Sequence, residues 1–181
     1  MRRLTSVVTS LIVAAAGAAL ANAPKQVIKK PAQLILKSDA IQSNGTIATE
    51  YTCDGSEQTP PLSWSTPPAE TKSIAIVVED PDAPNKVFTH WVVTGIPAAT
   101  TSLSGATLPE GAMAGKNDKG ITGWAGPCPP SGRHRYVFHV YALDISLSKE
   151  MTKADLTRAM AGHVLAVGEV MGTYTKQQMK K

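Results

Sequence analysis

The chain has 181 residues, with 18 Lys and Arg against 14 Asp and Glu, so its formal net charge at pH 7 is +4. This length suits one domain that buries a sizeable core. The lysines are scattered or lie near the two ends of the chain rather than forming a basic patch. We therefore expect no nucleic-acid partner.

The N-terminus carries an export pattern. Arg2 and Arg3 precede an apolar run over residues 4–20 that ends in small residues. This is typical of a secretory signal peptide, with cleavage favoured after Ala23 and a second position after Ala21. The run is shorter than the about 20 residues that a spanning helix needs, which disfavours an uncleaved anchor. We expect residues 1–23 to be removed, and the mature protein to be periplasmic or secreted with no transmembrane segment.

The mature chain begins with a linker over residues 24–32, and residues 33–181 are expected to form a single domain. Gln33 to Ser38 is a short strand candidate, and residues 44–61 are mostly loop. From Ser73 to Glu79 both faces of a period-two pattern are apolar, which predicts a central, buried strand. Asp80 continues the face that begins at Ile74, and Pro81 ends the strand because it has no N–H to donate.

Two further strands are predicted over residues 90–96 and 135–144. Period-two geometry places His134, Tyr136 and Phe138 on one face. Between these strands, residues 98–126 are rich in Gly, Thr and Ser with few apolar residues. We expect a long surface loop there, of a length that is usually functional or mobile.

The last predicted element is a helix. Thr152 is a plausible N-cap, and the pattern predicts an amphipathic helix of about six turns that ends near Gly172. Its apolar face would consist of residues that recur at spacings of three and four: Leu156, Met160, His163, Val167, Val170 and Tyr174.

Only two cysteines are present, Cys53 and Cys128, and both lie in loops punctuated by Gly and Pro. In an exported chain a disulfide between them is the economical interpretation. The alternative is a reactive thiol at Cys128, because His134 and Arg133 nearby could lower its pKa.

Four polar residues stand at strand ends beside two proline-rich turns: Asp80, His90, His134 and Tyr136. Histidine N–H groups, a phenol hydroxyl and the backbone amides of Ser131 and Gly132 are the donors from which an anion pocket is built. The carboxylate would orient a histidine or hold the ammonium group of a zwitterionic ligand.

Three other interpretations of these residues stay open. Each residue alone could be a turn former or a satisfied core residue. Two histidines and a carboxylate could form a facial metal triad, although no His-x-His or Glu-x-x-His spacing supports one. Catalysis could use Cys128 with His134, or His90 with Asp80. However, the sequence has no nucleophile elbow, phosphate-cradling loop or nucleotide fingerprint, so we expect neither an enzyme nor a cofactor.

The two turns and the strands that follow them resemble the phosphatidylethanolamine-binding protein family, and more narrowly its bacterial Raf kinase inhibitor-like branch. The similarity runs from about Gln33 to Tyr174. The motifs that carry it are Asp80-Pro81-Asp82-Ala83-Pro84 with His90-Trp91, then Gly126-Pro127-Cys128-Pro129-Pro130-Ser131-Gly132-Arg133-His134-Arg135-Tyr136-Val137-Phe138, and Tyr141-Ala142-Leu143-Asp144.

The resemblance implies a mainly β fold, with an antiparallel β-sandwich-like core and peripheral helices that include a C-terminal helix. It implies one small pocket for phosphate or phosphorylethanolamine head groups. The residues that match the family's pocket are Asp80, His90, His134 and Tyr136, with Cys128, Pro129 and Pro130 as its wall and Asp82 as a supporting turn carboxylate.

Two functions follow as hypotheses. The first is an exported binding protein for small phosphorylated ligands or phospholipid head groups. The second is an inhibitor of an extracytoplasmic protease or kinase that contacts its protein target through residues 98–126.

Overall fold

The computed structural model describes residues 30–42 and 45–177. The predicted signal peptide and the linker residues before Lys30 lie outside the described residues. The elements are β1 (Ala32–Gln33), β2 (Leu36–Lys37), the 3-10 helix η1 (Thr49–Tyr51), β3 (Leu62–Trp64), β4 (Ser73–Asp80), β5 (Phe88–Pro97), β6 (Ser102–Leu103), β7 (Met113–Ala114), β8 (Arg133–Leu143), α1 (Lys153–Ala159) and β9 (Val164–Thr175).

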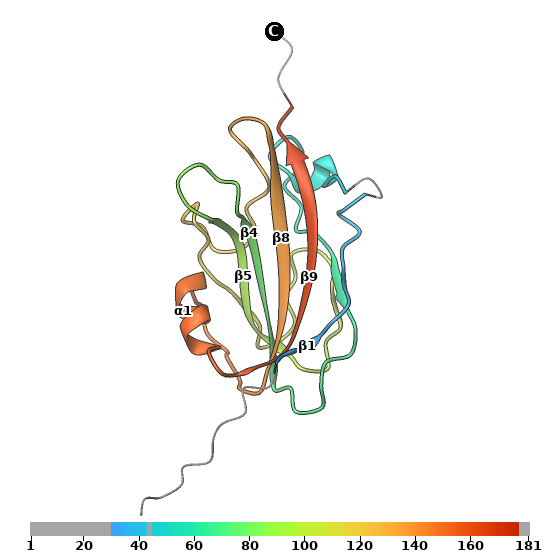
Figure 1. The fold of residues 1–181 in the computed structure, drawn as a ribbon, viewed down its shortest axis with the longest axis vertical. Helices are drawn as coiled ribbons and strands as arrows, with labels where there is room; N and C mark the ends of the chain where they lie inside the picture. Colours follow the sequence, from blue (N-terminus) through green and yellow to red (C-terminus); the bar gives the residue numbers. More distant parts are fainter. Residues whose placement is uncertain (1–29, 43–44, 178–181) are drawn as a thin grey trace, which may run out of the picture.

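A six-stranded sheet with the order β1-β9-β8-β4-β5-β7 organises the molecule. Figure 1 shows its long strands side by side. All its pairings are antiparallel except that of β1 with β9. β4 lies between β5 and β8, and its residues from Ser73 to Val78 are all buried. This confirms the central strand that its two apolar faces predict.

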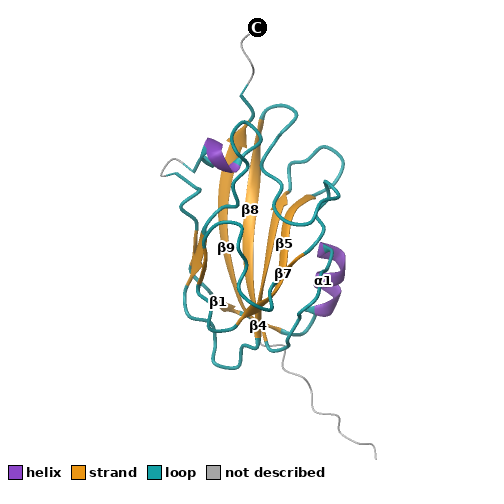
Figure 2. Ribbon diagram, turned by 180° about the vertical axis from the view of Figure 1, so that it is seen from behind, coloured by secondary structure: helices purple, strands orange, loops and turns teal. Residues whose placement is uncertain are grey.

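A second sheet of the short strands β2, β3 and β6 covers one face of the large sheet. In Figure 2 loops drawn in teal cross in front of the large sheet. Leu62, Trp64 and Leu103 of the small sheet belong to the same core as Ile76 and Phe138 of the large one. Burying each such large side chain contributes about 1.5–3 kcal/mol. The two layers confirm a mainly β, sandwich-like fold.

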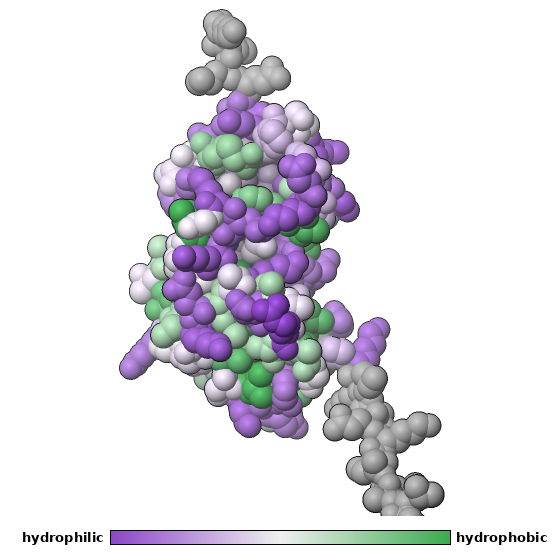
Figure 3. All heavy atoms as spheres, turned by 90° about the vertical axis from the view of Figure 1, so that its left-hand side faces the viewer, coloured by the Kyte–Doolittle hydropathy of each residue, from purple (hydrophilic) through white to green (hydrophobic). Residues whose placement is uncertain are grey.

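The opposite face of the large sheet is covered by α1. Leu156 of this helix and Met151 just before it pack on Ala75, Val77 and Leu143 in a second apolar cluster. Figure 3 views the side of the molecule that carries α1, and hydrophilic residues dominate there, with only small separate apolar patches. α1 has seven residues, and the described part of the chain contains no helix that is long and apolar enough to cross a membrane.

The prediction of a six-turn C-terminal helix is wrong. The helix begins after the Thr152 N-cap, whose hydroxyl accepts a hydrogen bond from the Asp155 amide, but it ends at Ala159. Gly162 follows with a φ of +81°, a conformation that ends helices and that glycine adopts without strain. From Val164 to Thr175 the chain is a strand, β9, paired with β8 over its length.

The misleading signal was the spacing of apolar residues. Val170 and Tyr174 are four apart, and an even spacing also keeps two residues on one face of a strand. Gly168 and Gly172 share that face, where a Cβ on Gly172 would lie 2.6 Å from Cγ1 of Ile47. Glycine lets β9 approach the neighbouring chain closely, which a propensity argument for a helix does not anticipate.

Two other predicted segments differ from the structure. The single strand predicted over 33–38 is divided into β1 and β2, which join different sheets. The predicted surface loop over 98–126 contains β6 and β7. It also buries Leu103, Asn117 and Ala125, so part of it belongs to the folded body of the domain.

Candidate functional site

Three strand ends meet at one end of the large sheet. Because β4 is antiparallel to both neighbours, its end lies beside the beginning of β5, where Asp80 pairs with Phe88, and beside the first half of β8, where Glu79 pairs with Val137. This topology brings together the four polar residues singled out in the sequence, Asp80, His90, His134 and Tyr136. All four side chains are buried or nearly so.

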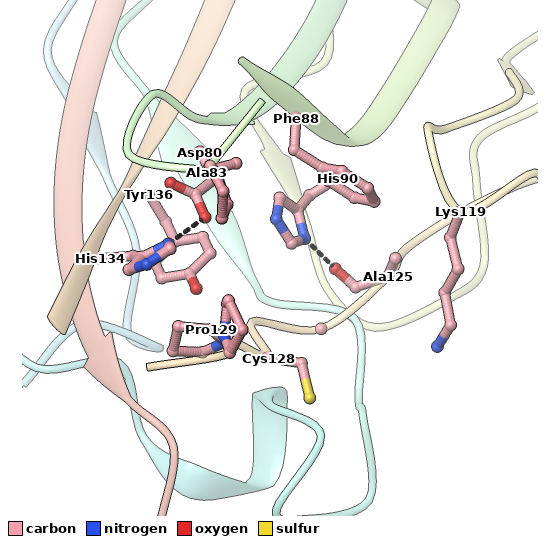
Figure 4. A pocket seen from close by; sticks show the side chains of 13 residues that line it. Asp80, Ala83, Phe88, His90, Lys119, Ala125, Cys128, Pro129, His134 and Tyr136 are labelled. Carbon is pink, nitrogen blue, oxygen red and sulfur yellow. Dashed lines mark hydrogen bonds and ion pairs between the residues drawn. The ribbon is translucent and has the colours of Figure 1, made fainter. Parts of the chain in front are cut away.

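These residues line a cavity of about 280 Å³ (Figure 4). Its base is polar and its walls are mostly apolar. The lining residues are Asp80, Ala83, Pro84, Phe88, His90, Lys119, Ala125, Gly126, Cys128, Pro129, Pro130, His134 and Tyr136.

Asp80 and His134 form a buried pair. Nδ1 of His134 donates to Oδ2 of Asp80 over 2.7 Å, because a carboxylate only accepts. The other carboxylate oxygen accepts a hydrogen bond from the Asp82 amide at 2.8 Å. The side chains of His134 and Asp80 are only 9% and 5% exposed. With Nδ1 engaged, Nε2 is the nitrogen through which His134 can contact a ligand.

His90 is fixed by the main chain of the loop opposite it. Its Nδ1 lies 2.6 Å from the carbonyl oxygen of Ala125 and donates to it, which again leaves Nε2 for a ligand. The ring contacts Phe88 and Tyr136, with centroids 4.9 and 5.1 Å away. Burial lowers the pKa of His90, against the opposing effects of the Ala125 carbonyl and the Asp80 charge. The free protein therefore holds this histidine neutral at pH 7.

Tyr136 supplies a hydroxyl that is free within the described protein. Its oxygen is buried and has no hydrogen-bond partner. Leaving a buried hydroxyl unpaired costs about 1–3 kcal/mol. Burial, followed by the charges of Asp80 and Asp82, raises the pKa of Tyr136 far above its ordinary value. The hydroxyl therefore keeps its proton and is available as a donor.

Asp82 holds the turn after β4 but does not line the cavity. Its two oxygens bind the Arg135 guanidinium in a forked pair at 2.9 and 2.7 Å, and Oδ2 also accepts from the Arg135 amide at 2.9 Å. These hydrogen bonds lower the pKa of Asp82 to about 2. The turn after β4 and the start of β8 are thereby tied together.

The wall over residues 126–132 is anchored by the predicted disulfide, which the structure confirms between Cys53 and Cys128. Prolines at 127, 129 and 130 remove three backbone donors from this segment. Within the described chain, its one hydrogen bond runs from the Cys53 amide to the Pro127 carbonyl, 3.1 Å. Cys53 therefore holds the wall both covalently and through its amide.

The remaining side of the cavity is a loop organised by Asn117. Its amide donates to the Gly123 carbonyl at 2.9 Å, and its Oδ1 accepts from the amides of Lys119 and Ile121. Asp118 accepts from the Thr89 amide of β5. These contacts hold the loop so that the Ala125 carbonyl accepts the hydrogen bond from His90. They also place Lys119 at the cavity, opposite His134 in Figure 4.

Seven of the eight residues predicted for the pocket line one cavity, and Asp82 supports it from outside. Ser131 and Gly132, whose amides were suggested as donors, are not among the lining residues. Sequence reasoning missed Ala83, Pro84, Phe88, Lys119, Ala125 and Gly126. Phe88 had a signal, because it stands two residues before His90 on the same strand face.

A metal site was one alternative for these residues. In residues 30–42 and 45–177, no group of three or more His, Cys, Asp or Glu side chains is arranged to hold a metal ion.

Comparison with known proteins assigns the chain to a family. The family model for the phosphatidylethanolamine-binding protein matches residues 37–175, and the chain belongs to this family. A UPF0098 protein of Methanothermobacter thermautotrophicus is 47% identical over 148 residues, which cover 78% of this chain and 98% of that protein.

Two solved structures share the fold. A putative phosphatidylethanolamine-binding protein homologue, CT736 from Chlamydia trachomatis, superposes with a TM-score of 0.74 at 39% identity. The match covers 80% of this chain and 99% of the CT736 chain. E. coli YbcL, described as a new member of the mammalian family, gives a TM-score of 0.73 at 33% identity and covers 81% and 100%.

Proposed function

We propose that the protein binds small phosphorylated ligands in the cavity of Figure 4, without chemical turnover. The observation that carries the proposal is the hydroxyl of Tyr136, a buried donor without a partner that lines the same cavity as two histidines. A phosphate oxygen would satisfy it.

The hydrogen-bonding pattern of the histidines supports the same ligand. In both rings Nδ1 is engaged, by Asp80 in His134 and by Ala125 in His90. When protonated, each ring therefore presents one N–H through Nε2. Together with the tyrosine hydroxyl this gives three donors for a tetrahedral anion, and charge-assisted hydrogen bonds of this kind are about twice as strong as neutral ones.

Substitution Tyr136→Phe tests the proposal, because it removes the hydroxyl and keeps the ring in the core. We expect affinity for inorganic phosphate, measured by isothermal titration calorimetry, to fall about tenfold. The free energy of unfolding should stay the same or rise, since the unpaired hydroxyl is gone. Tyr141→Phe is the matched control, because Tyr141 is on the same strand but outside the cavity. Equal phosphate affinity in wild type and Tyr136→Phe would contradict the proposal.

We also propose that binding takes place after export, in the periplasm or outside the cell. The Arg2-Arg3 pair with the apolar run that follows it supports this, and a disulfide persists in oxidising compartments. Fractionation of the source cells, with N-terminal sequencing of the mature protein, tests it. Recovery from the cytoplasm with residues 1–23 intact would refute it.

Inhibition of a protease or kinase is the second candidate function. It is favoured by Met113 and Ile121, two residues of the 98–126 segment that are each 44% exposed. Replacing both with Ser should abolish inhibition of a target enzyme and leave phosphate binding intact. Inhibition lost in Tyr136→Phe instead would assign it to the cavity.

A further inference from the structure

The cavity contains one carboxylate, and that carboxylate is already engaged. Both oxygens of Asp80 accept hydrogen bonds, from His134 and from the Asp82 amide, and the side chain is only 5% exposed. A cationic group on a ligand would need a carboxylate that it can reach, and Asp80 does not offer one.

The acidic residues around the cavity are engaged as well. Asp82 binds the Arg135 guanidinium. Asp118 binds Lys86 at 2.7 Å and the Thr89 amide. Glu57 lies 3.7 Å from Lys119. None of these three acidic residues lines the cavity, so in the described part of the chain the lining offers no free carboxylate to an ammonium group.

Apart from the histidines, Lys119 is the one residue with a basic side chain among the described residues that line the cavity, and it carries a full positive charge. Its side chain is 55% exposed, and its ion pair with Glu57 spans 3.7 Å. An exposed ion pair of this length contributes little to stability. A negative group on a ligand can therefore compete with Glu57 for the lysine. Figure 4 places Lys119 across the cavity from His134. For a phosphate held between the two histidines and Tyr136, we take the substituent to extend toward this lysine.

From these contacts we infer that the preferred ligand is a phosphomonoester whose substituent is anionic or uncharged, and that Lys119 selects against an ammonium substituent. Phe88, Pro84, Pro129 and Pro130 provide an apolar wall for the carbon atoms that join the two groups. The inference rests on the proposed phosphate-binding function and specifies its ligand class. It departs from a zwitterionic phosphorylethanolamine head group held through Asp80.

Three ligands of similar size test the inference: phosphoglycolate, ethyl phosphate and phosphorylethanolamine, which differ in having a carboxylate, a methyl or an ammonium group beyond the phosphate. We expect dissociation constants to increase in that order. Each step should be about twofold to fivefold, the range that exposed charge pairs give. Titration calorimetry of the mature, oxidised protein measures all three.

Lys119→Met should remove the advantage of phosphoglycolate over ethyl phosphate, so that the ratio of their two dissociation constants approaches one. Lys116→Met is the matched control, because Lys116 is an exposed lysine of the same loop that does not line the cavity. It should leave the order of the three ligands unchanged. The same change of order in both variants would overturn the role given to Lys119.

The outcomes separate this inference from the proposed function. If phosphorylethanolamine binds as tightly as ethyl phosphate or more tightly, the inference is overturned and phosphate binding stands. If none of the three ligands binds, both are overturned.

The source of the phosphomonoester can be a free metabolite or a lipid, and vesicle sedimentation distinguishes them. Phosphatidylcholine vesicles that contain phosphatidate are compared with vesicles that contain phosphatidylethanolamine. Retention on phosphatidate vesicles alone supports the inference with a lipid ligand. Retention on neither, with binding of the soluble esters, supports it with a soluble ligand. Retention on phosphatidylethanolamine vesicles alone overturns it.

Discussion

The carboxylate of Asp80, at the end of β4, accepts a hydrogen bond from Nδ1 of His134, near the start of β8, although 54 residues separate them in the chain. The pair is buried, and it joins two of the turns that surround the cavity. Its orientation directs Nε2 of His134 to the ligand, so the pair links the packing of the sheet to the proposed chemistry of the site.

Asp80→Asn should weaken both stability and binding. The substitution keeps the shape of the side chain but removes the charged acceptor of the hydrogen bond from Nδ1 of His134. We expect the free energy of unfolding in urea to fall by about 1–3 kcal/mol, and phosphate affinity to fall about tenfold or more. Asp39→Asn, in an exposed turn outside the cavity, should change neither. A variant at Asp80 with wild-type phosphate affinity would exclude this role for the pair.

Stability without ligand should fall as the pH is lowered. The folded state lowers the pKa of His90 by burial, and that of His139 for the same reason. Folding therefore favours the neutral rings, and this stability is fully present above the unfolded pKa of about 6.5. It is lost as the pH falls from there through the lower folded values. Urea unfolding at about pH 7.5 and about pH 5.5, in chloride buffer, measures this loss of the free energy of unfolding. In His139→Gln, only the part of the loss that comes from His90 should remain.

Sulfate should oppose that loss. It remains a dianion across this pH range, so its own titration does not enter. A dianion in the cavity stabilises the protonated form of His90, and its affinity should therefore increase as the pH falls through this range. Titration with sulfate at the same two pH values checks the sign. Affinity that is independent of pH would mean that His90 gains no proton on binding.

Reduction of the disulfide should loosen the cavity wall. The Cys53–Cys128 bond closes a loop with a sequence separation of 75, for which the chain-entropy model gives roughly 4 kcal/mol of stabilisation. Without it, residues 126–132 keep one backbone hydrogen bond to Cys53. We expect the reduced protein, and the double variant with Ser at both positions, to melt at a lower temperature and bind phosphate more weakly. Lower stability with unchanged affinity would show that the wall does not contact the ligand.

Gly168→Ala distinguishes the observed strand from the helix that the sequence suggested. In the interior of that helix the substitution would stabilise the protein by about 1 kcal/mol. In β9 the new Cβ would lie 2.9 Å from Cγ1 of Val140 and from the Leu34 carbonyl oxygen, and overpacking of this kind costs about 1–3 kcal/mol. The measurement is the free energy of unfolding. Met171→Ala, at an exposed neighbour on the other face, should change it by less than about 0.5 kcal/mol.

The parts of the fold that could be predicted depended on clear period-two patterns. β4 and β8 were found because their apolar residues and turn signals agree, and the same periodicity placed His134 and Tyr136 on one face. Resemblance to the family supplied the wall of the cavity. β9 was missed because its glycines and the even spacing of its apolar residues fit both a helix and a strand. What decides between them is its pairing with β8, which is a tertiary contact that the local sequence does not show.

Lys119 was not predictable in the same way. Its position depends on Asn117, whose side chain binds the backbone of the loop that follows it. Bonds of this kind leave no periodic pattern in a sequence. The charged residue to which we assign ligand preference is therefore one that only the folded loop reveals.

The forked pair between Asp82 and Arg135 has one more consequence. It joins the turn after β4 to β8, while the disulfide holds the wall and Asp118 holds the third loop on β5. Each segment of the rim is thus fastened to a neighbour before any ligand arrives. A ligand would enter a cavity whose rim is already ordered, so the conformational freedom lost on binding would be mainly that of the ligand. Selection would then depend on the size and charge of the groups that this pre-organised cavity accepts.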